Sequence, residues 1–213
     1  MRIILVSLLV FLCGFRQCLA QPQPTLEKLT YQLVNGVLMD LHPQTNPMVI
    51  RGANGNYQTI RPRPVDNNEP LLLLDRLNYG WASGQFVENP RGTPEWDALL
   101  QYFTEADIDY MRHQIPMARH FSLKQAEITH AGVKILALDT ILALQKRLDW
   151  RAPDILQQRY GSRRVHGLGG GLFSLNHRKA LIVASTEDGW EMYVYENSGA
   201  AWYRKATLQK GVE

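Results

Sequence analysis

Four glycines fall within five positions of this chain, and a glycine cluster is one way in which a backbone can hold a phosphate. The run consists of Gly167 and Gly169 to Gly171. In nucleotide-binding loops a helix follows the glycines, and its N-terminus faces the phosphate. Here Leu172 to Leu175 and then a strand-like segment follow. We interpret the glycines as a strand entry that allows close packing, and we expect no cofactor there.

The six histidines could bind zinc or transfer protons. They are His42, His113, His120, His130, His166 and His177. No two of them lie four residues apart, and Pro116 separates the pair that lies seven apart. Their spacing therefore predicts no metal site. A zinc or catalytic site would have to be assembled in space from distant His, Asp and Glu side chains.

Serine and carboxylate chemistry also lacks a recognisable spacing. The chain contains no Gly-x-Ser-x-Gly elbow and no Ser-x-x-Lys pair. Glu105, Asp107 and Asp109 lie close together, but acidic residues in the first turns of a helix stabilise its dipole. We assign them a structural role, and the catalytic residues, if any, stay unknown.

A binding protein could use an exposed aromatic surface or a basic one, and a basic segment supplies named candidates for the second. Residues 146–166 hold six Lys or Arg residues against two Asp. The candidate binding residues are Arg159, Arg163, Arg164 and His166. They could bind an anionic ligand, or they could form a solvated helix face. No aromatic residues alternate with them in the manner of a stacking surface, so we expect no nucleic-acid partner.

The first twenty residues have the layout of a secretory signal peptide. Arg2 precedes an apolar run from Ile3 to Phe15, and a small residue, Ala20, ends the segment. A membrane anchor is the alternative, but thirteen helical residues span only about 20 Å, short of the ~30 Å hydrocarbon core. We expect cleavage after Ala20 and a mature protein in the periplasm or the medium.

Removal of this leader changes the chemistry open to the chain. Both cysteines, Cys13 and Cys18, lie within it. The exported chain would therefore have no disulfide and no thiolate. Lipidation of either cysteine stays open, although the residues before each fit such processing poorly. The formal net charge of +3 would fall to about +1, which does not favour bulk binding to nucleic acid or a membrane surface.

The middle of the chain carries two helix starts. Thr93 and Pro94 form an N-cap and a first helical residue. The face of that helix is expected to hold Trp96, Leu99, Leu100 and Phe103. Thr104, with Asp107 three residues later, forms a partial capping box for the next helix. Its expected apolar stripe is Ile108, Met111 and Ile115, and Pro116 is expected to end it.

The remaining elements follow from periodicity and turn residues. Residues 25–41 suit a helix or a helix–strand pair, and residues 48–61 a hairpin turning near Asn54-Gly55. The expected further elements are strands at 71–75 and 132–138, a helix capped by Asp139 and running to Leu148, and a helix over Ala152–Tyr160.

The last third of the chain has the period of two that is typical of strands. Trp190, Met192 and Val194 alternate with Tyr193 and Tyr195. Strands over 179–185, 190–197 and 202–208, separated by short turns, predict an antiparallel meander. The fold class that follows is α+β, with central helices and a C-terminal antiparallel sheet of three or more strands in one domain, residues 21–213.

Several segments of the chain resemble a group of small exported bacterial proteins without assigned activity. The segments are FTEADIDYMRHQI, FSLKQAEITHAGVKIL, LFSLNHRKALIVAS and GWEMYVYENSGAAWYRK, within about residues 100–206. In that group an acidic-capped helix leads into a Phe-Ser segment and an aromatic β-meander. The resemblance implies export and architecture, and no catalytic residue. The insert between the last strands of that group is replaced here by TEDG.

These observations favour a non-enzymatic binding or envelope-associated protein. An unknown envelope or extracellular partner, or an anionic ligand, would be its target. The alternative is a hydrolase of an envelope or extracellular polymer with a His, Asp and Glu site assembled in space. An enzyme should bring at least two titratable groups together in a deep, apolar-walled pocket.

Overall fold

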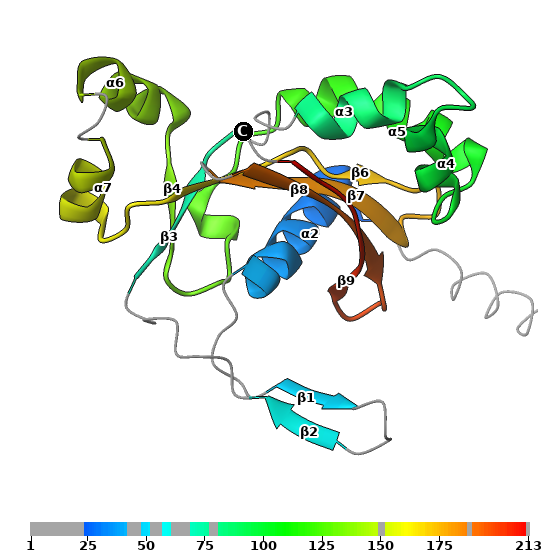
Figure 1. Ribbon diagram of the computed structural model, residues 1–213, viewed down its shortest axis with the longest axis horizontal. Helices are drawn as coiled ribbons and strands as arrows, with labels where there is room; N and C mark the ends of the chain where they lie inside the picture. The colour runs from blue at the N-terminus through cyan, green and yellow to red at the C-terminus, as the bar shows by residue number, and fades with distance from the viewer. Residues whose placement is uncertain are drawn as a thin grey trace, which may run out of the picture.

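The computed structural model describes residues 24–41, 48–51, 57–60, 69–76, 81–148, 152–186 and 189–211. These residues form an α+β fold, as the sequence predicts (Figure 1). The helices are α2 (Leu26–Leu41), α3 (Trp81–Glu88), α4 (Pro94–Leu100), α5 (Glu105–Arg119), α6 (Leu138–Leu148) and α7 (Ala152–Tyr160). The expected leader, and the turn at Asn54-Gly55, lie outside the described residues.

A mixed seven-stranded sheet is the centre of the fold. Its order is β4-β3-β5-β7-β8-β9, and β6 pairs with β7 beside β5. The strands are β3 (Leu71–Leu74), β4 (Val133–Leu136), β5 (Val165–Leu168), β6 (Leu172–Phe173), β7 (Lys179–Thr186), β8 (Gly189–Asn197) and β9 (Trp202–Gly211). The antiparallel meander predicted for residues 179–208 is present as β7, β8 and β9. Strands β3, β4 and β5 pair in parallel, which the sequence did not predict.

The hairpin expected between residues 48 and 61 is also present. Strands β1 (Met48–Arg51) and β2 (Tyr57–Ile60) pair antiparallel and form a separate two-stranded sheet. No helix among the described residues has the length and apolar character needed to cross a membrane.

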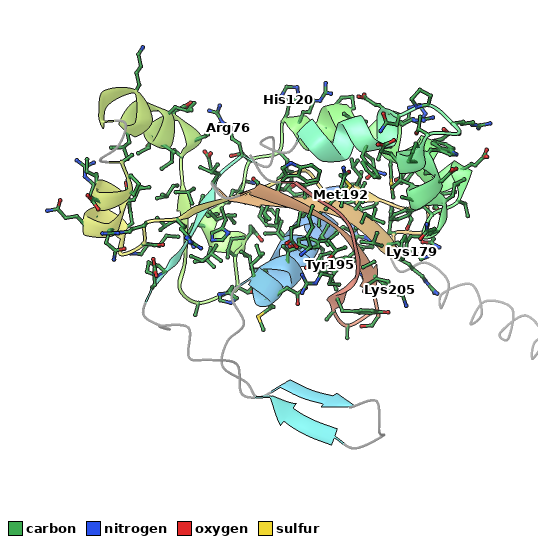
Figure 2. The ribbon with its side chains drawn as sticks, in the orientation of Figure 1. Arg76, His120, Lys179, Met192, Tyr195 and Lys205 are labelled. Carbon is green, nitrogen blue, oxygen red and sulfur yellow. The ribbon has the colours of Figure 1, made fainter. Side chains whose placement is uncertain are left out.

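Successive side chains of β8 point to opposite faces of the sheet and pack in two different hydrophobic cores. Met192 and Val194 pack with α3, α4 and α5, whereas Tyr193 and Tyr195 pack with α2. Figures 1 and 2 show α2 and the α3–α5 group on opposite sides of the sheet, with Met192 and Tyr195 on different faces. A third core joins α6 and α7 to β3 and β4. The predicted strand period therefore fixes which helix covers which face.

Helices α4 and α5 begin where the sequence predicts and end differently. Thr93 caps α4, and Thr104 with Asp107 forms a complete capping box for α5. Leu100 is the last residue of α4. It was expected on the buried face but is 40% exposed. The prediction that Pro116 ends α5 was wrong, since the helix continues to Arg119. A proline removes only one helical N–H bond, and Ala118 beyond it is held against the sheet.

The prediction that Asp139 caps α6 was also wrong. Asp139 lies inside the helix, which begins at Leu138. The amide of Leu138 donates to Asp75 Oδ1 at 2.9 Å, so a carboxylate at the end of β3 caps the helix. Asp139 instead pairs with Arg76, N to O 3.0 Å.

Candidate functional site

A pocket of about 470 Å³ lies where the glycine run meets α2 and α5. It is formed by the first turns of α2, the last turns of α5, the segment from His120 to Lys124, and the run itself. Its apolar wall consists of Leu26, Met117, Ala118, Phe121 and Phe173. Met117 is 51% exposed, so this wall opens to the solvent.

Two glycines allow both helices to approach the sheet at this pocket. A Cβ on Gly170 would lie 2.5 Å from the Cβ of Ala118 on α5. A Cβ on Gly171 would lie 2.7 Å from Leu33 Cδ2 on α2. Such distances are too short for a side chain at either position, so the run serves close packing, as the sequence predicts.

Gln114 is a buried residue of the pocket, and its side chain hydrogen-bonds to the main chain of β6. Its Nε2 donates to the carbonyl of Phe173 at 2.8 Å, and its Oε1 accepts from the Phe173 amide at 2.9 Å. Nε2 also donates to the Tyr110 carbonyl at 3.3 Å. The buried carboxamide thus takes the place of a paired strand at the open edge of β6.

The segment from His120 to Lys124 is fastened to α2 by one tyrosine. The Tyr31 hydroxyl donates to the Ser122 carbonyl at 3.4 Å and accepts from the Lys124 amide at 3.0 Å. At the rim, Lys124 Nζ lies 3.3 Å from Glu27 Oε1, and this hydrogen bond raises the pKa of Lys124. These contacts hold the segment from His120 to Lys124 against α2, and both line the pocket.

The titratable side chains of the pocket all stand at its rim. Lys124 is 67% exposed and Glu27 58% exposed. His120 is exposed at the end of α5 (Figure 2). Among the described residues, no group of three or more His, Cys, Asp or Glu side chains is close enough to hold a metal ion.

A second polar cluster lies at the turn between β6 and β7. Tyr110 Oη lies 3.1 Å from His177 Nε2, and His177 has a φ of 56°. Burial lowers the pKa of His177. Asp107 Oδ1 accepts from the Leu175 amide at 2.8 Å. The cluster fastens this turn to the first half of α5.

A third cluster ties the end of α2 to the last strands. The Tyr195 hydroxyl donates to Asp40 at 2.5 Å, and burial followed by this carboxylate raises the pKa of Tyr195. Tyr193 donates to Glu191 at 2.8 Å, and burial followed by that contact raises its pKa to about 12. Lys210 lowers the pKa of Glu191 by a hydrogen bond of 2.7 Å. Both tyrosines are buried, and these contacts give their hydroxyl groups hydrogen-bond partners.

The four basic candidates follow one another from α7 into β5. Arg159 lies in the last turn of α7, and Arg163 pairs with Asp154 at 3.1 Å. Arg164 is exposed, whereas His166 lies within β5 opposite Leu73. None of the four lines the pocket. Their role in binding an anionic ligand stays a prediction.

The pocket residues were missed by sequence reasoning because they come from four distant segments. The usable signal was the glycine run, which was interpreted as close packing without a neighbouring ligand site. No protein-family model, curated protein or solved structure matches this chain.

Proposed function

We propose that this chain is an exported, non-enzymatic binding protein whose ligand occupies the pocket beside Gly170 and Gly171. The observation that carries the proposal is the distribution of polarity, with apolar walls and titratable groups only at the rim. Sites that retain a small ligand are concave and mostly apolar, with volumes of about 300–1,000 Å³. The layout of residues 1–20 supports export to the periplasm or the medium.

The polymer hydrolase is the alternative, and the pocket favours it less. Acid–base catalysis needs positioned groups whose pKa values suit proton transfer, within reach of the substrate. Glu27 and Lys124 neutralise each other in an exposed ion pair, and His120 is exposed beside them. Such groups can orient the polar end of a ligand without forming a desolvated catalytic pair.

The experiment is a fluorescence titration with the neutral apolar dye N-phenyl-1-naphthylamine. The test variant is Met117→Lys, which places an ammonium group in the apolar wall. Met39→Lys is the matched control, because Met39 is 49% exposed and lies two residues before the end of α2 as Met117 does in α5. We expect about tenfold weaker dye binding for Met117→Lys alone, since tenfold corresponds to ~1.4 kcal/mol of lost contact.

Two results would contradict the proposal. One is no saturable dye binding to the native chain. The other is equal weakening by both lysine variants, which would place the dye elsewhere or indicate a general effect of charge.

A further inference from the structure

Gly170 and Gly171 lie directly before β6 and alternate in direction as strand residues do. A Cβ on Gly170 would point at Ala118 of α5, whereas one on Gly171 would point at Leu33 of α2. The two residues that follow pack on the α5 side and the α2 side in the same order. Side chains that alternate between two faces are the mark of a pleated strand. The pleat therefore runs through residues 170–173.

This pleat sets the direction of the main-chain groups. In an extended strand, the N–H and C=O of alternate residues point to the same edge. Those of Phe173 point away from β7, because both bond to the Gln114 carboxamide. Those of Gly171, two residues earlier, point to the same open edge.

Gly171 meets the pocket at this edge. It is buried and lines the cavity. Within the described residues, neither its amide nor its carbonyl has a hydrogen-bond partner. Because Gly171 lines the cavity, water is the partner open to its amide and carbonyl, and a ligand that displaces this water must replace the lost hydrogen bonds. This position therefore favours a ligand that can pair with both groups.

We propose, on the basis that the pocket is a ligand site, that its ligand is a short, extended apolar peptide segment. One residue of the peptide adds a rung beside β6. Its N–H donates to the Gly171 carbonyl, and its C=O accepts from the Gly171 amide, as the Gln114 carboxamide does at Phe173. Its apolar side chains cover Leu26 and Met117. This is strand addition, in which main-chain bonds supply affinity and adjacent walls select side chains.

A hydrocarbon chain fits this pocket less well. It would cover the apolar wall but would exclude water from the Gly171 amide and carbonyl without replacing the lost hydrogen bonds. A strongly charged ligand is also disfavoured, because Glu27 and Lys124 already neutralise each other at the rim. An uncharged peptide backbone with apolar side chains satisfies both the wall and the edge.

The test compares two probes of the same shape. The first is acetyl-Leu-Leu dimethylamide, and the second replaces both leucine nitrogens by ester oxygens, which removes the two N–H donors that the first probe has. Their affinities are measured by displacement of N-phenyl-1-naphthylamine from the native chain, Met117→Lys and Met39→Lys. Chemical shifts of ¹⁵N-labelled glycines report the contact at Gly171, with exposed Gly92 as an internal reference.

We expect the diester to bind about five- to tenfold more weakly than the peptide, which is the effect of one lost hydrogen bond. The Gly171 amide should shift on peptide binding while Gly92 does not, and Met117→Lys should weaken both probes. Equal affinity of peptide and diester, or failure of both while the dye still binds, would overturn the peptide proposal and leave the binding function intact. Failure of the dye as well would overturn both.

Discussion

Asp107 is a single carboxylate that connects two elements. It accepts from the Thr104 amide at 3.0 Å and the Thr104 hydroxyl at 2.8 Å, which caps α5. Its other oxygen accepts from the Leu175 amide in the β6–β7 turn. Partial burial acts to raise the pKa of Asp107, but these hydrogen bonds outweigh it and hold the pKa below its usual value.

We predict that Asp107→Ala lowers the free energy of unfolding by about 2 kcal/mol, from the lost cap and the lost turn contact. Urea denaturation measures this change. The control is Asp109→Ala, two residues along, whose partly exposed pair with Arg112 should contribute less than ~0.5 kcal/mol. Because the folded pKa is lowered, the contribution of Asp107 is present above the usual carboxyl pKa and is lost as pH falls through the folded value. Equal losses for the two variants would contradict this account.

His177 should make the stability of the fold depend on pH in a second range, above the range in which Asp107 titrates. Burial lowers the pKa of His177, so the unfolded chain takes up this proton first as pH falls. Its contribution is full above the usual pKa of about 6.5 and is lost as pH falls through the folded value. We predict that the native chain loses more stability between about pH 7.5 and about pH 5.5 than His177→Gln does. Parallel urea-denaturation profiles for the two proteins would exclude this role.

At the scale of the elements, the approach of α5 to the glycine run depends on two small residues. A methyl group at Gly170 would meet the Cβ of Ala118 at 2.5 Å and its backbone oxygen at 3.2 Å. We predict that Gly170→Ala costs about 2 kcal/mol of unfolding free energy through overpacking. Ala118→Gly alone should cost at most ~1 kcal/mol from helix propensity.

The double variant separates overpacking from a general loss of chain freedom. Removing the Ala118 methyl group relieves the main clash, so the double variant should lose less stability than the two single losses combined. Additive losses, measured by urea denaturation, would show that Gly170 is not limited by this contact.

The elements that the sequence predicts well are those set by local chemistry. The period of two in β8 and the Thr-based caps of α4 and α5 were all confirmed. Helix α3 was missed, because Gly84 within it weakens a helical pattern. Strand β5 was missed because it has only four residues and two of them, His166 and Gly167, are not typical of strands. The cap of α6 could not be predicted either, since Asp75 reaches Leu138 from a distant part of the chain.

At the scale of the whole molecule, the candidate site arises only when distant segments meet. Leu26, Gln114, Phe121 and Gly171 have no common spacing in the sequence, yet all line one pocket. The glycine run could be predicted as a place of close packing, because glycine is the residue that permits it. The sequence could not predict which helices pack against the run, or the open edge beside Gly171, because both depend on how distant segments pack together.

The central claim is that this pocket binds a ligand, and one ratio tests it most directly. It is the dissociation constant of N-phenyl-1-naphthylamine for Met117→Lys divided by that for Met39→Lys, with both variants shown to unfold at similar urea concentrations. We predict a ratio of about ten, because only Met117 contributes to the apolar wall. A ratio near one would show that the pocket does not hold the dye, and would contradict the proposed function.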